Sequence, residues 1–145
     1  MDVRIKKLDP RAKIPTYGSA DAAGADLYAL LDEPLTIAPH GTFLVPTGLS
    51  VEIPAGNMGL IFARSSLGTK RGLAPANKVG VIDADYRGQI MVSLHNHSEL
   101  PQTVEPFERI AQFVIVPFIR AAFQETDALS DTDRGEGGFG STGTR

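Results

Sequence analysis

The sequence has 145 residues, of which 42% are hydrophobic and 21% charged, as is typical of one soluble globular domain. It contains no cysteine, which excludes disulfides, thiolate metal sites and a cysteine nucleophile. No apolar run approaches the roughly 20 residues of a membrane helix, and the start lacks the apolar stretch of a signal peptide. We therefore expect a cytoplasmic protein with no membrane partner.

The charge is unevenly distributed along the chain. Residues 1–123 hold 12 acidic and 12 basic side chains, whereas residues 124–145 hold five acidic and two basic ones, so the net charge of −3 lies in the tail. Broad contact with a phosphate backbone needs a basic surface. We expect no nucleic-acid partner.

In chain order, the predicted elements are almost all strands, because the hydrophobic pattern repeats every two residues. Pro- and Gly-containing turns separate these runs, and the best helical candidate is one turn at 65–70. The spacing favours an all-β sandwich, jelly roll or barrel. The predicted strands are 35–37, 42–45, 49–53, 58–63, 89–94 and 110–116.

The tail is rich in Asp, Thr, Ser and Gly from residue 124 onward. Composition favours either a disordered acidic tail or one that orders over a ligand or a neighbouring subunit. The letters of 135–140 match G-x-G-x-x-G, but too few residues follow for the helix that a dinucleotide fold needs. The residue types in this segment still favour binding of a nucleotide. Glycines and hydroxyls can bind an anion, an arginine can pair with it, and an aromatic ring can cover a base; the residues are Arg134, Phe139, Gly140, Ser141 and Thr142.

A second cluster, Arg64-Ser65-Ser66, directly follows the apolar run 58–63. An arginine and two hydroxyls at the end of a strand, opening a helical turn, can hold a phosphate. The alternative is a surface turn with a solvated arginine.

A third cluster spans 77–90. An apolar run leads into Asp83 and returns after Gly88, which predicts a β-hairpin. Such a tip is often only a turn. Because Asp83 follows Val81-Ile82, however, we expect it to be partly buried and able to act as a base, with the flat face of Tyr86 beside it.

Isolated polar residues give weaker signals. Asp26 at a strand start is either a turn residue or, beside a triphosphate, an acid that holds Mg²⁺ through water. His95 and His97 share a strand face, but zinc needs more ligands. Gln112 lies in an apolar strand and needs a polar partner from the protein or a ligand.

In their order and spacing, five segments resemble the five motifs of the trimeric dUTPase family: 23–29, 63–68, 77–90, 108–112 and 134–143. The resemblance covers nearly the whole chain. Two departures lie beside the phosphate cluster, because many members have Pro where Ala63 stands and Gly where Ser66 stands.

The resemblance implies a jelly-roll-like distorted β-barrel over residues 1–123, and a flexible Gly-rich arm, 124–145, that closes over the active site. It implies a homotrimer with active sites shared between subunits. It also implies Mg²⁺ and hydrolysis of dUTP to dUMP and pyrophosphate, which keeps uracil out of DNA and supplies dUMP for thymidylate synthesis.

Residue roles follow from the same resemblance. Asp83 resembles the base that orients the attacking water, and Asp26 resembles the acid near the water shell of the metal. Tyr86 resembles the residue that packs on deoxyribose, and Arg109 is expected to hold structure. The remaining implied contacts are Arg64, Ser65, Ser66 and Gln112 to phosphates, Asn77, Gly80 and Val81 to uracil, and Arg134, Phe139, Gly140, Ser141 and Thr142 from the arm, with Phe139 over the ring.

Two other functions are weighed. A dCTP deaminase of the same superfold resembles this chain in fold but uses a Glu near the hairpin, where this chain has Asp83. A non-catalytic trimeric β module would not need Asp83. The products distinguish the three functions: a dUTPase releases pyrophosphate, a deaminase releases ammonia, and a non-catalytic module forms no product.

Overall fold

The computed structural model describes residues 1–138. Thirteen elements follow one another in this part of the chain, twelve strands and one helix. They are β1 (Arg4–Lys7), β2 (Thr16–Tyr17), β3 (Ala25–Tyr28), β4 (Leu35–Ile37), β5 (Thr42–Pro46), β6 (Leu49–Glu52), β7 (Asn57–Phe62), α1 (Ser65–Arg71), β8 (Leu73–Pro75), β9 (Gly80–Ile82), β10 (Met91–Asn96), β11 (Gln102–Val104) and β12 (Arg109–Pro117).

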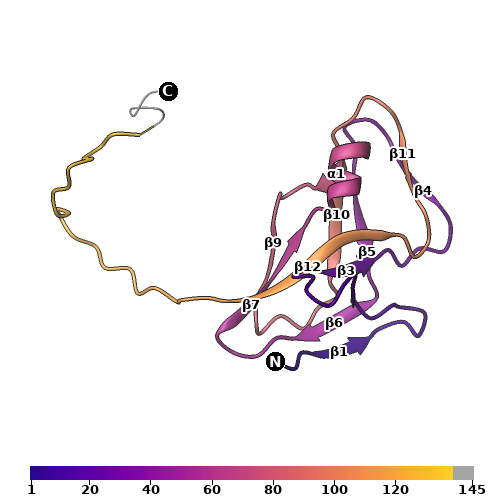
Figure 1. The fold of residues 1–145 in the computed structure, drawn as a ribbon, viewed down its shortest axis with the longest axis horizontal. Helices are drawn as coiled ribbons and strands as arrows, with labels where there is room; N and C mark the ends of the chain where they lie inside the picture. Colours follow the sequence, from indigo (N-terminus) through magenta and orange to yellow (C-terminus); the bar gives the residue numbers. More distant parts are fainter. Residues whose placement is uncertain (139–145) are drawn as a thin grey trace.

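The strands form four antiparallel sheets (Figure 1). The largest has the order β2-β3-β12-β7-β9, the second has the order β5-β10-β8, and β1-β6 and β11-β4 are pairs. Neighbours in these sheets are mostly distant in sequence, as in a jelly roll. The sheets are not closed into one ladder, and the predicted all-β, distorted jelly-roll fold is confirmed.

One hydrophobic core joins the sheets. Alternate residues of β10 are buried, so Val92 and Leu94 enter the core and the residues between them face outward. Leu27 of β3, Val45 of β5 and Ile110 of β12 meet them there at 0–1% exposure.

The predicted helical turn is present as α1. Gly72 ends the helix in the left-handed conformation, φ 68°, and its N–H donates to the Leu67 carbonyl. Leu67 is the buried residue that holds the helix on the barrel. Within residues 1–138, no helix is long and apolar enough to cross a membrane.

The predicted hairpin over 77–90 is wrong. β9 pairs with β7, whereas β10 pairs with β5 and β8, so the two apolar runs belong to different sheets. Each run pairs with strands elsewhere in the chain, and residues 83–90 cross between the sheets. This opens a space between β9 and β10 that a closed hairpin would lack.

The chain leaves the barrel after β12. Residues 118–138 form no strand or helix and extend away from the sheets (Figure 1). Ile119 and Phe123 in this segment are 95% and 97% exposed.

Gly59 of β7 provides a test of the core. A Cβ there would lie 2.4 Å from Cε2 of Phe113, which is a buried ring. We expect Gly59→Ala to lower the free energy of unfolding by about 1–3 kcal/mol, the usual cost of overpacking. Urea denaturation measures it, with Gly18→Ala as the control because a Cβ at Gly18 meets nothing within 4 Å. Equal stability of the two variants would contradict this packing.

Candidate active site

A buried carboxylate between two arginines organises one end of the large sheet. Asp26 of β3 is 4% exposed. Arg64 Nε donates to its Oδ1 at 2.8 Å, and Arg109 Nη1 donates to its Oδ2 at 3.1 Å. A carboxylate this deeply buried needs such partners. Asp26 thereby fixes the direction of both guanidinium groups.

The strand register brings the other predicted phosphate contacts to the same end of the sheet. Gln112 of β12 lies opposite Asp26 on one side and Phe62 on the other. Ser65 and Ser66 are exposed at the start of α1, and Arg64 Nη1 lies 3.4 Å from Ser66 Oγ. Asp26, Arg64, Ser65, Ser66 and Gln112 therefore form one polar cluster, which we call the arginine cluster.

A cavity of about 150 Å³ lies between the two main sheets, in the space between β9 and β10. Gly80 and Asn77 line it, together with Leu44 of β5 and Met91 of β10. Among the described strands, β9 pairs only with β7, so its other backbone edge has no strand partner. The cavity therefore combines apolar walls with free peptide groups.

The sequence alone does not identify Leu44 and Met91 as lining residues. Leu44 is 52% exposed although it lies within a strand. An apolar side chain on the outer face of a strand is a weak signal of a binding surface.

Asp83 lies at the start of a turn beyond β9. The Tyr86 N–H donates to the Asp83 carbonyl at 3.1 Å, and Tyr86 Oη donates to the Gln89 carbonyl at 3.0 Å. Asp83 is exposed, so the expected partial burial is wrong for the single chain. It follows the end of an edge strand, where no neighbouring strand covers it. Val81 is likewise 57% exposed.

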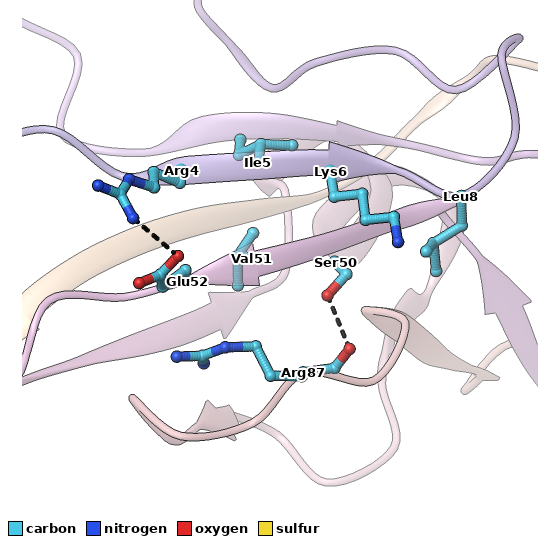
Figure 2. Close-up of a pocket in the computed structure, with 8 residues that line it drawn as sticks. All are labelled: Arg4, Ile5, Lys6, Leu8, Ser50, Val51, Glu52 and Arg87. Carbon is cyan, nitrogen blue, oxygen red and sulfur yellow. Dashed lines mark hydrogen bonds and ion pairs between the residues drawn. The ribbon is translucent and has the colours of Figure 1, made fainter.

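The segment after this turn is fastened to β6. Ser50 Oγ donates to the Arg87 carbonyl at 2.7 Å, as Figure 2 shows, and the Gly48 N–H donates to Gln89 Oε1 at 2.9 Å. The groove drawn in Figure 2, about 340 Å³, lies beside this attachment. The backbone of the segment that follows Tyr86 is therefore fixed by hydrogen bonds and does not form a free loop.

Asp83 and the arginine cluster lie at opposite ends of β7. The pairing of Gly59 with Ile82 places Asp83 beside Met58. From Met58 to Phe62 the strand rises roughly 13 Å, and Arg64 is two residues further on. One chain therefore does not bring its own Asp83 next to its own Arg64.

The described part of the predicted arm, residues 124–138, lies apart from both groups (Figure 1). Arg134 is exposed, and its Nε donates to the Gly137 carbonyl at 2.7 Å. The predicted arm contacts Phe139, Gly140, Ser141 and Thr142 lie outside the described residues.

The histidine pair does not form a metal site with neighbouring side chains. The rings of His95 and His97 lie 4.4 Å apart edge to face, and His95 Nδ1 lies 2.8 Å from Thr42 Oγ1. In residues 1–138 no three His, Asp or Glu side chains are grouped so that they could hold a metal ion.

Comparison with known proteins gives the family. The family model for dUTPase matches residues 10–143. Deoxyuridine 5'-triphosphate nucleotidohydrolases from Burkholderia cenocepacia and Thiobacillus denitrificans are 48% and 49% identical to this chain, with 99% of each chain covered. The dUTPase of Staphylococcus bacteriophage 80alpha with dUPNHPP superposes with a TM-score of 0.89 at 28% identity, covering 98% of both chains.

The chain belongs to the dUTPase family. The expected enzyme class, dUTP diphosphatase, is confirmed with it.

The Asp26 ion pairs give a prediction for stability. Asp26→Asn keeps the shape of the side chain but removes the charge that both arginines contact. We expect the free energy of unfolding to fall by about 1–3 kcal/mol, because the largely buried Arg64 guanidinium is left poorly paired. Asp32→Asn is the matched control: Asp32 is 83% exposed and also pairs with an arginine, Arg11. Urea denaturation should show a larger loss for Asp26→Asn, and equal losses would contradict the role of burial.

Proposed function

We propose that the protein is a cytoplasmic enzyme that hydrolyses dUTP to dUMP and pyrophosphate, with Asp83 activating the attacking water. This reaction keeps uracil out of DNA and supplies dUMP for thymidylate synthesis. The observation that carries the proposal is the cavity at the free edge of β9, because it offers apolar walls and peptide groups together.

The size and lining of this cavity suit uracil. A cavity of about 150 Å³ can hold a benzene ring, and this one has the same volume. Peptide N–H and C=O groups near Gly80 and Val81, with the Asn77 amide, can match the edge of uracil. Cytosine reverses part of that donor and acceptor pattern and would leave buried groups unpaired. In this proposal the walls of the slot exclude the methyl group of thymine by steric clash.

The arginine cluster suits the phosphates. Asp26 occupies Arg64 Nε and so turns the two terminal nitrogens of the guanidinium away from itself. A guanidinium held in this way can donate two parallel hydrogen bonds to phosphate oxygens. Ser65, Ser66 and Gln112 add neutral donors beside it.

Asp83 acts as the base in this proposal. Its carboxylate takes a proton from water while the water oxygen forms a bond to the α-phosphorus. The bond from that phosphorus to the bridging oxygen then breaks, and pyrophosphate leaves with the electron pair. The exposed position of Asp83 in the single chain lets water reach it.

The side chains of this site can hold Mg²⁺ only through metal-bound water molecules. Asp26 already accepts from two arginines, but an ionised carboxylate has about four acceptor positions, so it can also accept from a metal-bound water. Mg²⁺ usually keeps several waters and is held mainly by substrate phosphates. When bound, the ion would offset the negative charge that repels the nucleophile.

The separation of Asp83 from Arg64 supports a homotrimer with shared sites. If both groups act on one triphosphate, they come from different subunits, because β7 keeps them apart within one chain. A closed symmetric ring supplies such a pairing at each interface. The exposed apolar side chains of Ile119, Phe123 and Leu129 also favour contact with a neighbouring subunit.

The arm then completes the site. In this proposal residues 124–145 close over the bound nucleotide, Arg134 and the hydroxyls of Ser141 and Thr142 contact phosphates, and Phe139 covers uracil. Ordering the arm costs conformational entropy, so closure requires contacts to both the base and the phosphates.

The role of Asp83 is tested by Asp83→Asn. The amide cannot accept the proton, so we expect hydrolysis of dUTP to fall by at least ~10²-fold while dUTP binding persists. Asp85→Asn, in the same exposed turn, is the control and should keep most activity. Turnover of Asp83→Asn close to that of the parent would sink the assignment. If the parent protein released ammonia, it would be a deaminase. If the parent formed no product, it would be a non-catalytic module.

The role of Tyr86 is tested by the choice of sugar. If the ring fills the space of a 2′-hydroxyl, the parent strongly prefers dUTP to UTP, and Tyr86→Ala narrows the difference in kcat/KM. Equal hydrolysis of both nucleotides by the parent would show that the steric role is wrong.

The arm is tested by removing residues 134–145. We expect an unchanged melting temperature and oligomer mass, because the core lies within β1 to β12, but a large loss of turnover. Phe139→Ala should cause part of this loss. We expect a decrease in kcat/KM equivalent to about 1–3 kcal/mol, the scale of base–aromatic stacking. A truncated protein with the turnover of the parent would contradict closure.

A further inference from the structure

Gly88 lies directly beneath the ring of Tyr86. A Cβ at Gly88 would lie 2.3 Å from Tyr86 Oη, 2.5 Å from Cζ and 2.8 Å from Cε2. Gly88 is not one of the glycines with positive φ, so its backbone conformation is open to other residues. The need for glycine here comes from the tyrosine ring and not from the backbone.

The backbone around Gly88 is anchored on both sides. Ser50 Oγ holds the Arg87 carbonyl at 2.7 Å (Figure 2), and the Ile90 N–H donates to the Leu49 carbonyl at 2.7 Å. Gln89 is fastened by its side chain to the Gly48 N–H at 2.9 Å. Tyr86 is 42% exposed, so its ring has space to move. A methyl group at position 88 would therefore displace the ring rather than the segment.

We infer that Gly88 is a specificity-determining residue that positions Tyr86 for the discrimination of deoxyribose from ribose. The inference rests on the proposed function, in which Tyr86 excludes the 2′-hydroxyl. A ring pushed off Gly88 loses the hydrogen bond from Oη to the Gln89 carbonyl, and the space it vacates can take a hydroxyl group. Gly88 touches no substrate in this account and acts through Tyr86.

The test compares kcat/KM for dUTP and UTP in five proteins. They are the parent, Gly88→Ala, Tyr86→Ala, the double variant, and Gly18→Ala as a control with open space around the new methyl group. We expect Gly88→Ala to lower the preference for dUTP by about tenfold, within the range that one methyl group is worth in a specificity site. Gly18→Ala should leave the preference unchanged.

The double variant separates positioning from general damage. With the ring absent, the methyl at position 88 has nothing to displace, so Gly88→Ala should not change the preference further in the Tyr86→Ala background. An equal effect of Gly88→Ala in both backgrounds overturns the inference, because the methyl would then act through the backbone. If Gly88→Ala melts early, the double variant should recover the melting temperature of Tyr86→Ala, and no recovery also overturns it.

The outcomes distinguish this inference from the proposed function. If Tyr86→Ala lowers the preference and Gly88→Ala does not, Gly88 has no such role and the proposed function stands. If the parent hydrolyses dUTP but Tyr86→Ala changes nothing, the role of Tyr86 and this inference fall together. If the parent does not hydrolyse dUTP, the proposed function itself is wrong.

Discussion

The antiparallel register of β7 is the constraint on which the arrangement of the site depends. β7 pairs with β12 on one side and β9 on the other. It carries Arg64 just beyond one end and, through β9, Asp83 at the other. A strand is stiff, so these two groups stay separated however the side chains turn. In the proposed function, a site that uses both groups would therefore be built across an interface between subunits.

Hydrogen bonds from two different sheets hold the two parts of the candidate site in place. Asp26 lies inside the sheet with both oxygens accepting hydrogen bonds, which fixes the direction of the Arg64 and Arg109 side chains. The segment after Asp83 is hydrogen-bonded to Ser50 of β6 and to Gly48 just before that strand. Groups held in place beforehand need not be ordered during the reaction, which favours catalysis. Among the described residues, 118–138 are the segment that the sheets do not hold.

Local pattern predicted the long elements well. The period-two runs at 58–63 and 110–116 correspond to β7 and β12, and the turn at 65–70 corresponds to α1. The short strands β1, β2 and β11 escaped prediction because they have two to four residues each and are mostly polar or exposed. β1 and β11 pair with strands distant in sequence, and β2 pairs with β3, so these strands depend on their partners and not on their own sequence.

The sequence indicated candidate site residues but not how the fold arranges them. The hairpin was wrong because β9 finds β7 about 20 residues back, which no local pattern encodes. The pairing of Arg109 with Asp26 joins residues 83 apart in sequence. The exposure of Asp83 follows from the edge position of β9, which depends on the order of all five strands in the sheet.

The most direct test of shared sites is complementation between two inactive variants, Asp83→Asn and Arg64→Gln. Each is purified, and the two are then unfolded together and refolded in equal amounts. If Asp83 and Arg64 come from different subunits, about a quarter of the sites in randomly mixed trimers hold both intact groups, so turnover of dUTP returns. If one chain supplies both groups, no site is intact and the mixture stays as inactive as its parts, which would contradict the account.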